Sequence, residues 1–223
     1  MECVETMDDR TLMKYLSSFC MGDGGVYPVR KGYKQCYFVG GHIEKNADYV
    51  EWKRSVLANV TKVRVKRIVK EGQQVFLRIE TRSHPVFQQI RQRLYRGTYR
   101  GIDSHFLKLM DWEMLAILFQ DDGHARDRSH VNRNPEITLG LCRLSEGDFE
   151  LLRKRIEKVL GINFNISGSP RNRVLRLRNK HGPVFMKCVK PFIFPSMEYK
   201  FINPDVWLAR GNNGQGDIVR TMQ

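Results

Sequence analysis

One stretch of this chain occurs twice, and its repetition constrains the fold more than any other feature. Residues 16–24 read LSSFCMGDG and residues 115–123 read LAILFQDDG. In each copy an apolar, helix-forming run ends in Asp-Gly, which places Asp23 and Asp122 99 positions apart. Alone, such an ending is first of all a helix stop, because glycine accepts the left-handed backbone that a helix C-terminus needs. The second copy therefore matters only if its surroundings repeat too.

The surroundings do repeat, in one order and with nearly one spacing. The repeated landmarks are residues 49–60 and 149–160, residues 85–94 and 183–192, and residues 99–102 and 199–202. A fixed period of this kind indicates duplicated structural units. We therefore predict an N-terminal unit over residues 1–102 and a C-terminal unit over residues 103–203. Residues 204–223, rich in Gly, Asn and Gln, are predicted to form a flexible tail.

Each unit is predicted to run α-β-β-α-β-β-α, which makes the fold class α+β. In the first unit the pattern predicts helices at residues 10–22, 46–60 and 85–95, and strands at residues 25–41 (two strands), 62–70 and 74–82. In the second unit the predicted helices run from a cap at Asp111 to residue 121, over residues 146–160, and from Pro183 with interruptions at Pro191 and Pro195. The predicted strands there are residues 124–131, 136–142, 163–168 and 173–180.

The predicted strands alternate apolar and basic residues. Because successive side chains point to opposite faces of a sheet, each strand would turn an apolar face to the helices and a basic face outward. An ordinary solvated face explains one such strand, but four of them in two matching halves favour a positive surface that follows a duplex. The predicted DNA-binding residues are Lys31, Gln35, Lys62, Arg64, Lys66, Arg78, Arg82, His124, Arg126, Arg128, His130, Arg171, Arg173, Arg176, Arg178 and Lys180.

Composition agrees with a polyanionic partner. The formal net charge is +14, and for a chain this basic nucleic acid is a commoner partner than a membrane. No apolar run reaches membrane-spanning length. The five cysteines are scattered without a CxxC pair, and the first nine residues carry acids but no Lys or Arg. We expect a protein that is not secreted and works in a reducing compartment with its target DNA, an organelle matrix or a bacterial, archaeal or phage-host cytoplasm.

Taken together, these residues resemble the LAGLIDADG homing endonucleases in the single-chain form with two motif copies. LSSFCMGDG and LAILFQDDG lie on the LAGLIDADG motif, with Asp23 and Asp122 at its last acidic position. GGHIEKNADYVEWKRSVL (residues 40–57) and PSMEYKF (residues 195–201) are similar to the family as well, and the resemblance covers residues 8–203. It implies two motif helices side by side on a pseudo-twofold axis, and two antiparallel four-stranded sheets that form a DNA-binding saddle.

The resemblance also implies an activity. Members cut both strands of a long, nearly asymmetric DNA site across the minor groove, by metal-dependent hydrolysis, and leave short 3′ overhangs. The family carries a basic residue near the scissile phosphate, and Arg100 and Lys200 occupy that place, so we expect them to stabilise charge or order water. A surface cation near a repeat boundary is an equally good interpretation of either. The family's polar residue near the acid is Gln35 or His42 in the first half, with no candidate in the second.

The two acids suit a metal site on physical grounds. A helix C-terminus carries partial negative charge and unpaired carbonyls, so a carboxylate added there is costly without a cation. We therefore predict divalent-cation sites at Asp23 with the Gly22 carbonyl, and at Asp122 with the Asp121 carbonyl. Hard oxygen ligands favour Mg²⁺, two or more ions in total, with Mn²⁺ as a substitute.

Close packing of the motif helices requires small residues, because side-chain size sets the distance between helix axes. Ser17, Ser18, Gly22 and Ala116 meet this need. Ile117 and Gln120 are bulkier than the family's usual residues and predict an uneven seam between the helices.

Two function classes are open, and a third has less support. The first is a monomeric, intron-encoded or mobile-element-encoded endonuclease with a double-stranded DNA target. The second is an intron maturase of the same fold, whose partner would be host intron RNA. The third is a DNA-binding regulator without cleavage, against which the presence of both Asp23 and Asp122 speaks. No intein-type splicing residues are evident, so we expect a free-standing protein.

Overall fold

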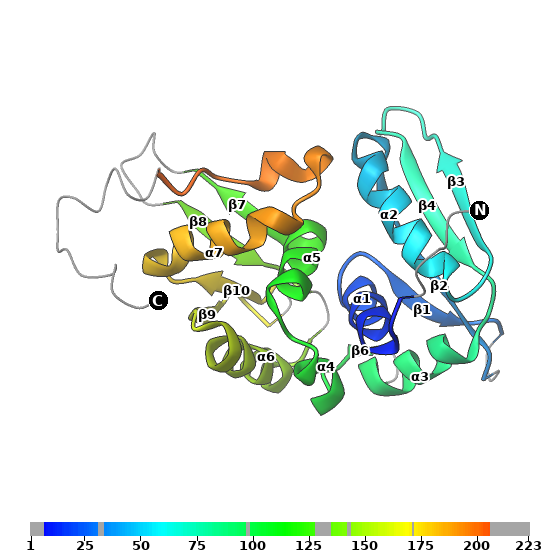
Figure 1. Ribbon diagram of the computed structural model, residues 1–223, viewed down its shortest axis with the longest axis horizontal. Helices are drawn as coiled ribbons and strands as arrows, with labels where there is room; N and C mark the ends of the chain where they lie inside the picture. Colours follow the sequence, from blue (N-terminus) through cyan, green and yellow to red (C-terminus); the bar gives the residue numbers. More distant parts are fainter. Residues whose placement is uncertain are drawn as a thin grey trace.

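Each half of the chain forms a four-stranded antiparallel sheet with helices packed on it (Figure 1). The computed structural model describes residues 7–30, 34–96, 99–127, 135–141, 144–170 and 172–205. The strand order is β1-β2-β4-β3 in the first sheet and β7-β8-β10-β9 in the second, so the two halves share one topology. The predicted α+β class, with two antiparallel four-stranded sheets in duplicated units, is confirmed.

The predicted order of elements is observed in both halves. The first half contains α1 (Asp9–Met21), β1 (Gly25–Pro28), β2 (Cys36–Ile43), α2 (Ala47–Ala58), β3 (Val63–Ile68), β4 (Phe76–Thr81) and α3 (Pro85–Leu94). The second contains α5 (Trp112–Asp122), β7 (Gly123–Arg126), β8 (Glu136–Leu139), α6 (Glu146–Leu160), β9 (Phe164–Ser167), β10 (Val174–Leu177) and α7 (Gly182–Val189). Shorter elements were not predicted: α4 (Ser104–Lys108), the pair β5 (Tyr95–Arg96) and β6 (Tyr99–Arg100), and 3₁₀ turns η1 (Glu44–Asn46), η3 (Asn179–His181), η4 (Lys190–Phe192) and η5 (Pro195–Lys200).

Side-chain caps determine where the main helices begin. Asp8 accepts a hydrogen bond from the Thr11 backbone at the start of α1, and Asp111 caps α5 in the same way, as predicted. Ser145 and Asp148 form a reciprocal capping box at the start of α6. These caps satisfy backbone N–H groups that have no partner within the helix. Among the described helices, none has the length and apolar character needed to cross a bilayer.

The strand register sorts side chains onto two sheet faces. Val26, Phe38 and Ile79 lie buried beneath the helices of the first half, as the alternating pattern predicts. β3 departs from the prediction, because Val65 on its apolar side is 37% exposed. β3 is an edge strand with no neighbour on one side, so its apolar side is only partly covered.

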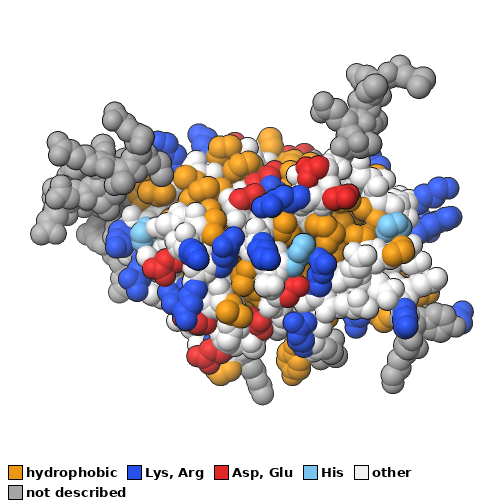
Figure 2. Space-filling view, turned by 60° about the horizontal axis from the view of Figure 1, so that its bottom comes forward, with side chains coloured by type: hydrophobic (Ala, Val, Ile, Leu, Met, Phe, Trp, Pro, Cys, Tyr) orange, Lys and Arg blue, Asp and Glu red, His pale blue; other side chains and the backbone are white. Residues whose placement is uncertain are grey.

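The outer sheet faces carry paired charges as well as free ones. Lys66 and Arg78 both form ion pairs with Glu80, and Arg176 pairs with Glu136 in the second sheet. In the space-filling view, Lys and Arg side chains are spread over one face of the molecule with acidic side chains among them (Figure 2). Glu80 and Glu136 therefore pair with some of the basic side chains on the outer sheet faces.

The two motif helices, α1 and α5, pack against each other at the centre of the molecule (Figure 1). The small residues predicted for this seam are buried there, with Ser18 and Ala116 fully enclosed. The two halves approach closely at the end of α1, where a Cβ atom on Gly22 would lie 2.1 Å from the Asp121 carboxylate. Gly22 is therefore required for packing, although its φ of −87° is not in the left-handed region.

We expect Gly22→Ala to destabilise the protein by about 1–3 kcal/mol, because the added methyl overlaps Asp121 and the seam must widen. Denaturant unfolding measures the change. Gly147→Ala is the matched control, since a Cβ there meets only Ser145 Oγ at 3.8 Å and lies within α6, where alanine is favoured. Equal stability of Gly22→Ala and the unmodified protein would contradict the packing interpretation.

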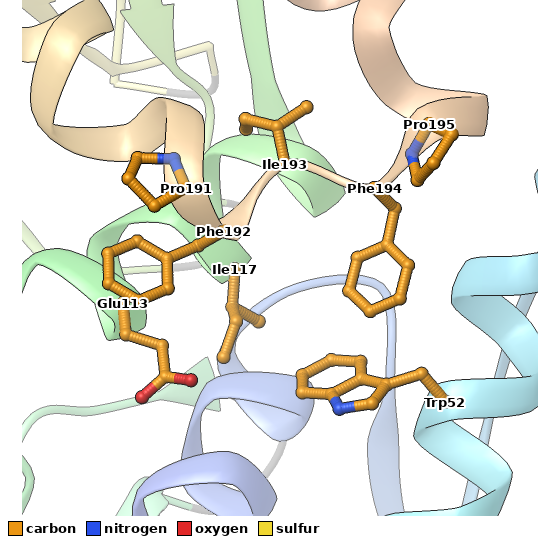
Figure 3. A pocket seen from close by; sticks show the side chains of 8 residues that line it. All are labelled: Trp52, Glu113, Ile117, Pro191, Phe192, Ile193, Phe194 and Pro195. Atoms are coloured by element: carbon orange, nitrogen blue, oxygen red, sulfur yellow. The ribbon is translucent and has the colours of Figure 1, made fainter.

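The two bulky residues contact the segment that follows α7. Ile117 lines a cavity of about 290 Å³ together with Trp52, Phe194 and neighbouring residues (Figure 3). The Gln120 amide donates to the Phe192 carbonyl at 3.0 Å and accepts from the Phe194 backbone N–H at 2.8 Å. Gln120 therefore anchors the segment after α7 to α5.

The opposite end of the seam carries a polar contact between the halves. Lys14 of α1 forms ion pairs with Asp111, at 2.9 Å, and with Glu113, and Tyr15 donates to Glu113 at 2.6 Å. Lys14 and Glu113 lie 99 positions apart, so they are counterparts in the two units. Opposite charges at counterpart positions favour pairing of the first unit with the second over pairing of two identical units.

Candidate active site

The two motif acids lie at the C-terminal ends of the paired helices. Asp23 follows the cap residue Gly22 of α1, and its side chain is 32% exposed. Asp122 is the last residue of α5 and is more deeply placed. Its burial and the nearby negative charges of Asp23 and Asp121 raise the pKa of Asp122 to about 7. The fold thus brings Asp23 and Asp122 together, as the duplicated motif predicts.

Asp122 has one buried carboxylate oxygen, Oδ2, without a hydrogen-bond partner among the described residues. An unpaired buried oxygen costs free energy unless a donor or a cation approaches it. A carboxylate oxygen of this kind is the hard ligand that a divalent cation prefers. The residues at this position therefore fit a divalent metal ion.

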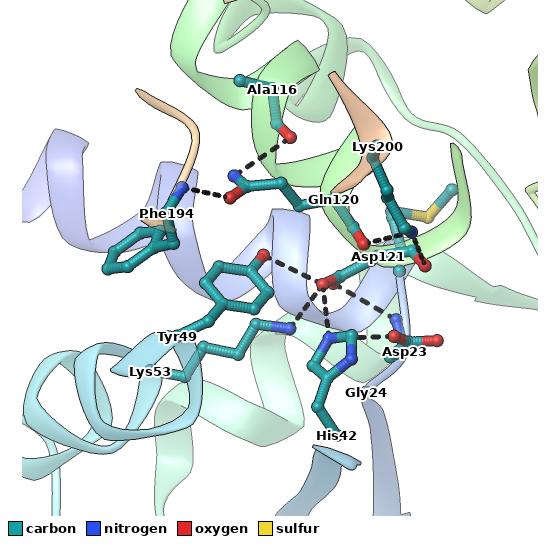
Figure 4. Close-up of polar contacts among 12 residues, drawn as sticks. Asp23, Gly24, His42, Tyr49, Lys53, Ala116, Gln120, Asp121, Phe194 and Lys200 are labelled. Atoms are coloured by element: carbon teal, nitrogen blue, oxygen red, sulfur yellow. Dashed lines mark hydrogen bonds and ion pairs between the residues drawn. The ribbon is translucent and has the colours of Figure 1, made fainter. Parts of the chain in front are cut away.

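The carboxylate of Asp121 is fully buried between the two halves, a placement that its sequence position did not predict. One oxygen accepts hydrogen bonds from Lys53 Nζ at 2.6 Å, Tyr49 Oη at 2.9 Å and His42 Nε2 at 3.1 Å (Figure 4). The other accepts from the Asp23 backbone N–H at 3.2 Å. Burial opposes ionisation, but the Lys53 charge and the His42 hydrogen bond hold the pKa of Asp121 well below its usual value.

Two sequence signals could have revealed this buried pair. Lys53 lies on the same helical stripe as the apolar residues at 49, 52 and 56, so it faces the interior. Asp121 occupies the place that Gly22 has in the first motif copy. A lysine on a buried stripe and a carboxylate at the end of a buried helix each require a partner of opposite charge.

His42 connects Asp121 to Asp23. Its Nε2 atom lies 3.1 Å from Asp121 Oδ1 and 3.0 Å from Asp23 Oδ2. Burial lowers the pKa of His42, but the hydrogen bonds to Asp121 and Asp23 outweigh it and leave that pKa raised. Of the two candidates for the polar partner of Asp23, His42 is thus the one in contact.

Gln35, the other candidate, lies at the far end of the β1–β2 pair. Its backbone carbonyl accepts from the Val29 N–H, beyond the Pro28–Cys36 end of the strand pair. Asp23 precedes β1 at the opposite end, so Gln35 does not reach it.

Arg100 and Lys200 bind the ends of the two motif helices and are not free surface cations. Arg100 donates to the carbonyls of Met21 at 2.6 Å, Gly22 at 2.9 Å and Gly24 at 2.7 Å. Lys200 donates to the Gln120 carbonyl at 2.6 Å and more weakly to that of Asp121 at 3.3 Å. These positive charges offset the negative helix ends.

The predicted carbonyl ligands are therefore already hydrogen-bonded. The Gly22 and Asp121 carbonyls accept from Arg100 and Lys200, so a cation there would share them with a basic side chain. Burial lowers the pKa of Lys200, although nearby carboxylates act against the shift. The carboxylates of Asp23 and Asp122 are left as the ligands that best fit a metal.

A second possible metal cluster lies beside the first. Ligand atoms of Asp23, His42 and Asp121 all fall within 4.8 Å of one another, at the edge of a cavity of about 310 Å³ that Lys200 also lines. Both Asp121 oxygens already accept protein hydrogen bonds, so this residue suits a supporting role better than metal ligation.

A model of the LAGLIDADG DNA endonuclease family matches residues 19–185, which span both motif acids and both sheets. The chain belongs to this family. The two motif copies, the repeat and the strand pattern are the features on which the LAGLIDADG resemblance depended.

Individual relatives were also found. The chain is 26% identical over 205 residues to "Protein RecA" of Mycolicibacterium flavescens, covering 88% of this chain and 47% of that protein. It thus spans about half the length of such curated relatives. It is 26% identical over 88 residues to "Probable intron-encoded endonuclease 1" of Wickerhamomyces canadensis, covering 40% of this chain and 38% of the relative.

Among solved structures, the homing endonuclease I-WcaI bound to its DNA recognition sequence has a TM-score of 0.72 at 20% identity, with 87% of both chains covered. That likeness shows the LAGLIDADG fold.

The predicted DNA-binding residues lie mainly on the outer faces of the two LAGLIDADG sheets. The register places Arg64 opposite Glu80 and Lys66 opposite Arg78 in the first sheet. In the second sheet it aligns His124, Thr138, Arg176 and Asn165 across the four strands. Lys62, Arg82 and Arg178 are exposed beside strand ends, and Arg126 is exposed on β7.

Two of these predictions need correction. Lys180 was predicted on the face of β10, but β10 ends at Leu177 and Lys180 lies in the 3₁₀ turn η3. Arg173 pairs with Glu146 of α6 at 3.1 Å, so it points toward the helix side of the sheet. Lys31, Arg128, His130 and Arg171 lie outside the described residues.

Proposed function

We propose that the chain is a site-specific homing endonuclease that makes a double-strand break in a long, nearly asymmetric DNA target and leaves short 3′ overhangs. The supporting observation is the position of Asp23 and Asp122 at the ends of the packed helices α1 and α5, with an unpaired buried oxygen on Asp122. The similarity to a homing endonuclease solved with its DNA site agrees with this proposal.

Different side chains would have different roles in phosphodiester hydrolysis. Asp23 and Asp122 would hold Mg²⁺, or Mn²⁺ in its place, and the bound metal would supply an activated water and neutralise the leaving oxygen. Arg100 and Lys200 place positive charge at both helix ends, where the scissile phosphates would approach. His42 holds the second oxygen of Asp23 and leaves the first free for the metal.

DNA binding is assigned to the outer sheet faces. Exposed cations such as Arg64, Lys66, Arg126 and Arg176 would contact backbone phosphates and base edges of a duplex. We propose that the units 1–102 and 103–203 each cover half of the target and act within a single monomeric chain, as the Lys14–Glu113 pair between counterpart positions favours. The protein would act in a reducing compartment that contains the target DNA.

The test is cleavage of a plasmid that carries the DNA flanking the gene's insertion site, joined without the insertion. The expected result is linear plasmid with short 3′ overhangs in the presence of Mg²⁺ and none with EDTA. Tight binding to the host intron transcript without DNA cleavage would instead favour the maturase, and sequence-specific DNA binding without cleavage the regulator.

Metal binding is expected to depend on pH through Asp122. Because the pKa of Asp122 is raised to about 7, a proton competes with the cation below that pH, and apparent Mg²⁺ affinity falls by about tenfold per pH unit there. Above pH 7 the carboxylate is ionised in the absence of metal, and the dependence levels off. Calorimetric Mg²⁺ titrations at pH 5.5 to 8.5 measure this, and Asp122→Asn serves as the control that should lose the dependence. An affinity that stays constant between pH 5.5 and 7 would contradict it.

A further inference from the structure

The two halves of the active site carry different residues at equivalent positions. The pairs Val26–Phe38 and Ala125–Ile137 of the two sheets are related by the same spacing of 99 positions as the motif acids. That spacing makes Leu141 the counterpart of His42, and Gly22 the counterpart of Asp121. The repeated helix stripe makes Phe149 and Arg153 the counterparts of Tyr49 and Lys53.

The second half fills the equivalent space without buried charge. Leu141 and Phe149 are apolar and each only 1% exposed. Arg153 lies near the surface, where it pairs with Glu150 at 2.7 Å and Glu157 at 3.2 Å. The fold can therefore close this region with apolar side chains, as it does in the second half. Burying Lys53 of the first half against Asp121 of the second carries a desolvation cost that packing alone does not require.

A series of contacts connects the buried charges of Lys53 and Asp121 to the motif acid Asp23. Lys53 Nζ lies 2.6 Å from Asp121 Oδ1, that oxygen lies 3.1 Å from His42 Nε2, and His42 Nε2 lies 3.0 Å from Asp23 Oδ2. Asp121 also accepts the backbone N–H of Asp23 through its other oxygen. Asp23 is therefore held at both its side chain and its backbone, as Figure 4 shows.

Asp122 lacks this support. Its Oδ2 has no partner among the described residues, and at the place of His42 its own half has Leu141, which has no polar side-chain atom. A hydrogen bond to a ligating carboxylate fixes its orientation, and loss of such a bond commonly costs 10- to 100-fold in activity or metal affinity. The two acids thus differ in how firmly they are held.

We propose that Lys53, Asp121 and His42 form a one-sided positioning network for Asp23, so that the two strands of the target are cut at unequal rates, the strand served by Asp23 first. This inference depends on the proposed endonuclease function. Within the network His42 contacts the Asp23 side chain and Asp121 its backbone N–H, whereas Lys53 acts through Asp121, so all three are positioning residues. We therefore expect a DNA intermediate that is nicked in one defined strand.

The test is strand-resolved cleavage of a target duplex labelled at one end of each strand, with Mg²⁺. The double variant Asp121→Ala/Lys53→Met removes both buried charges together, so neither remains unpaired. We expect the unmodified protein to nick one strand preferentially, and the double variant to nick that strand at least about tenfold more slowly while the other strand changes by less than about threefold. The matched control Arg153→Met alters the counterpart of Lys53 and should leave the ratio of the two rates unchanged.

A second readout is independent of cleavage. In imidazole ¹⁵N spectra of the free protein, the His42 Nε2–H signal, assigned by its loss in His42→Leu, should be protected from exchange in the unmodified protein and not in the double variant. If the unmodified protein did not cleave DNA but its His42 signal were protected, the proposed function would be contradicted. The network of contacts would still be supported. Equal strand rates in the unmodified protein, or equal slowing of both strands in the double variant, would overturn the inference while the endonuclease stands.

Discussion

Asp23→Asn and Asp122→Asn should each reduce double-strand cleavage by about 1,000-fold or more, because each would remove one of the proposed anionic metal ligands and with it about 4 kcal/mol of transition-state stabilisation. DNA binding should stay within a few-fold, since the exposed cations that would contact phosphates lie on the sheets. Rates of plasmid linearisation and gel-shift titrations with Ca²⁺ measure the two quantities separately.

The control for this prediction is Asp103→Asn, which alters an aspartate that caps α4 outside the candidate site. It should lose at most the stability of one helix cap, about 1 kcal/mol, and retain cleavage. If either active-site variant still cut both strands at the rate of the unmodified protein, the assignment of the catalytic acids would be wrong.

Lys53→Met alone should be the most destabilising of the substitutions considered, by about 3–5 kcal/mol, because it leaves the buried Asp121 carboxylate without its cation. Lys53 is 1% exposed and the Asp121 side chain is fully buried, so water cannot compensate. Chemical denaturation at pH 7 measures the loss.

Removal of both charges in Asp121→Ala/Lys53→Met should restore most of that stability, because an uncharged pair carries no unpaired ion. Arg153→Met is the surface control, with an expected change within about 1 kcal/mol because its ion pairs are partly solvated. A single variant Lys53→Met as stable as the control would show that Asp121 finds another partner or is neutral.

Much of the fold was predictable because short-range sequence patterns specify it. Helix stripes, proline positions and the Asp111 cap predicted the order of elements and, for α6, its bounds. Strand ends were less accurate, as Lys180 shows, because they depend on pairing with a neighbouring strand and not on local sequence.

The sequence by itself determined the duplication, the α+β class and the two motif acids, because a repeated pattern at a constant spacing is visible without knowledge of contacts. Only the tertiary structure decided which polar groups meet. Lys53 and Asp121 are 68 positions apart, and their 2.6 Å ion pair exists because α2 of one half lies against the end of α5 of the other. The same holds for Arg100 and Lys200, whose placement on helix-end carbonyls nearly 80 positions away follows from chain folding. Burial turns these distant residues into obligatory partners, since a charge removed from water must find its counter-charge within the protein.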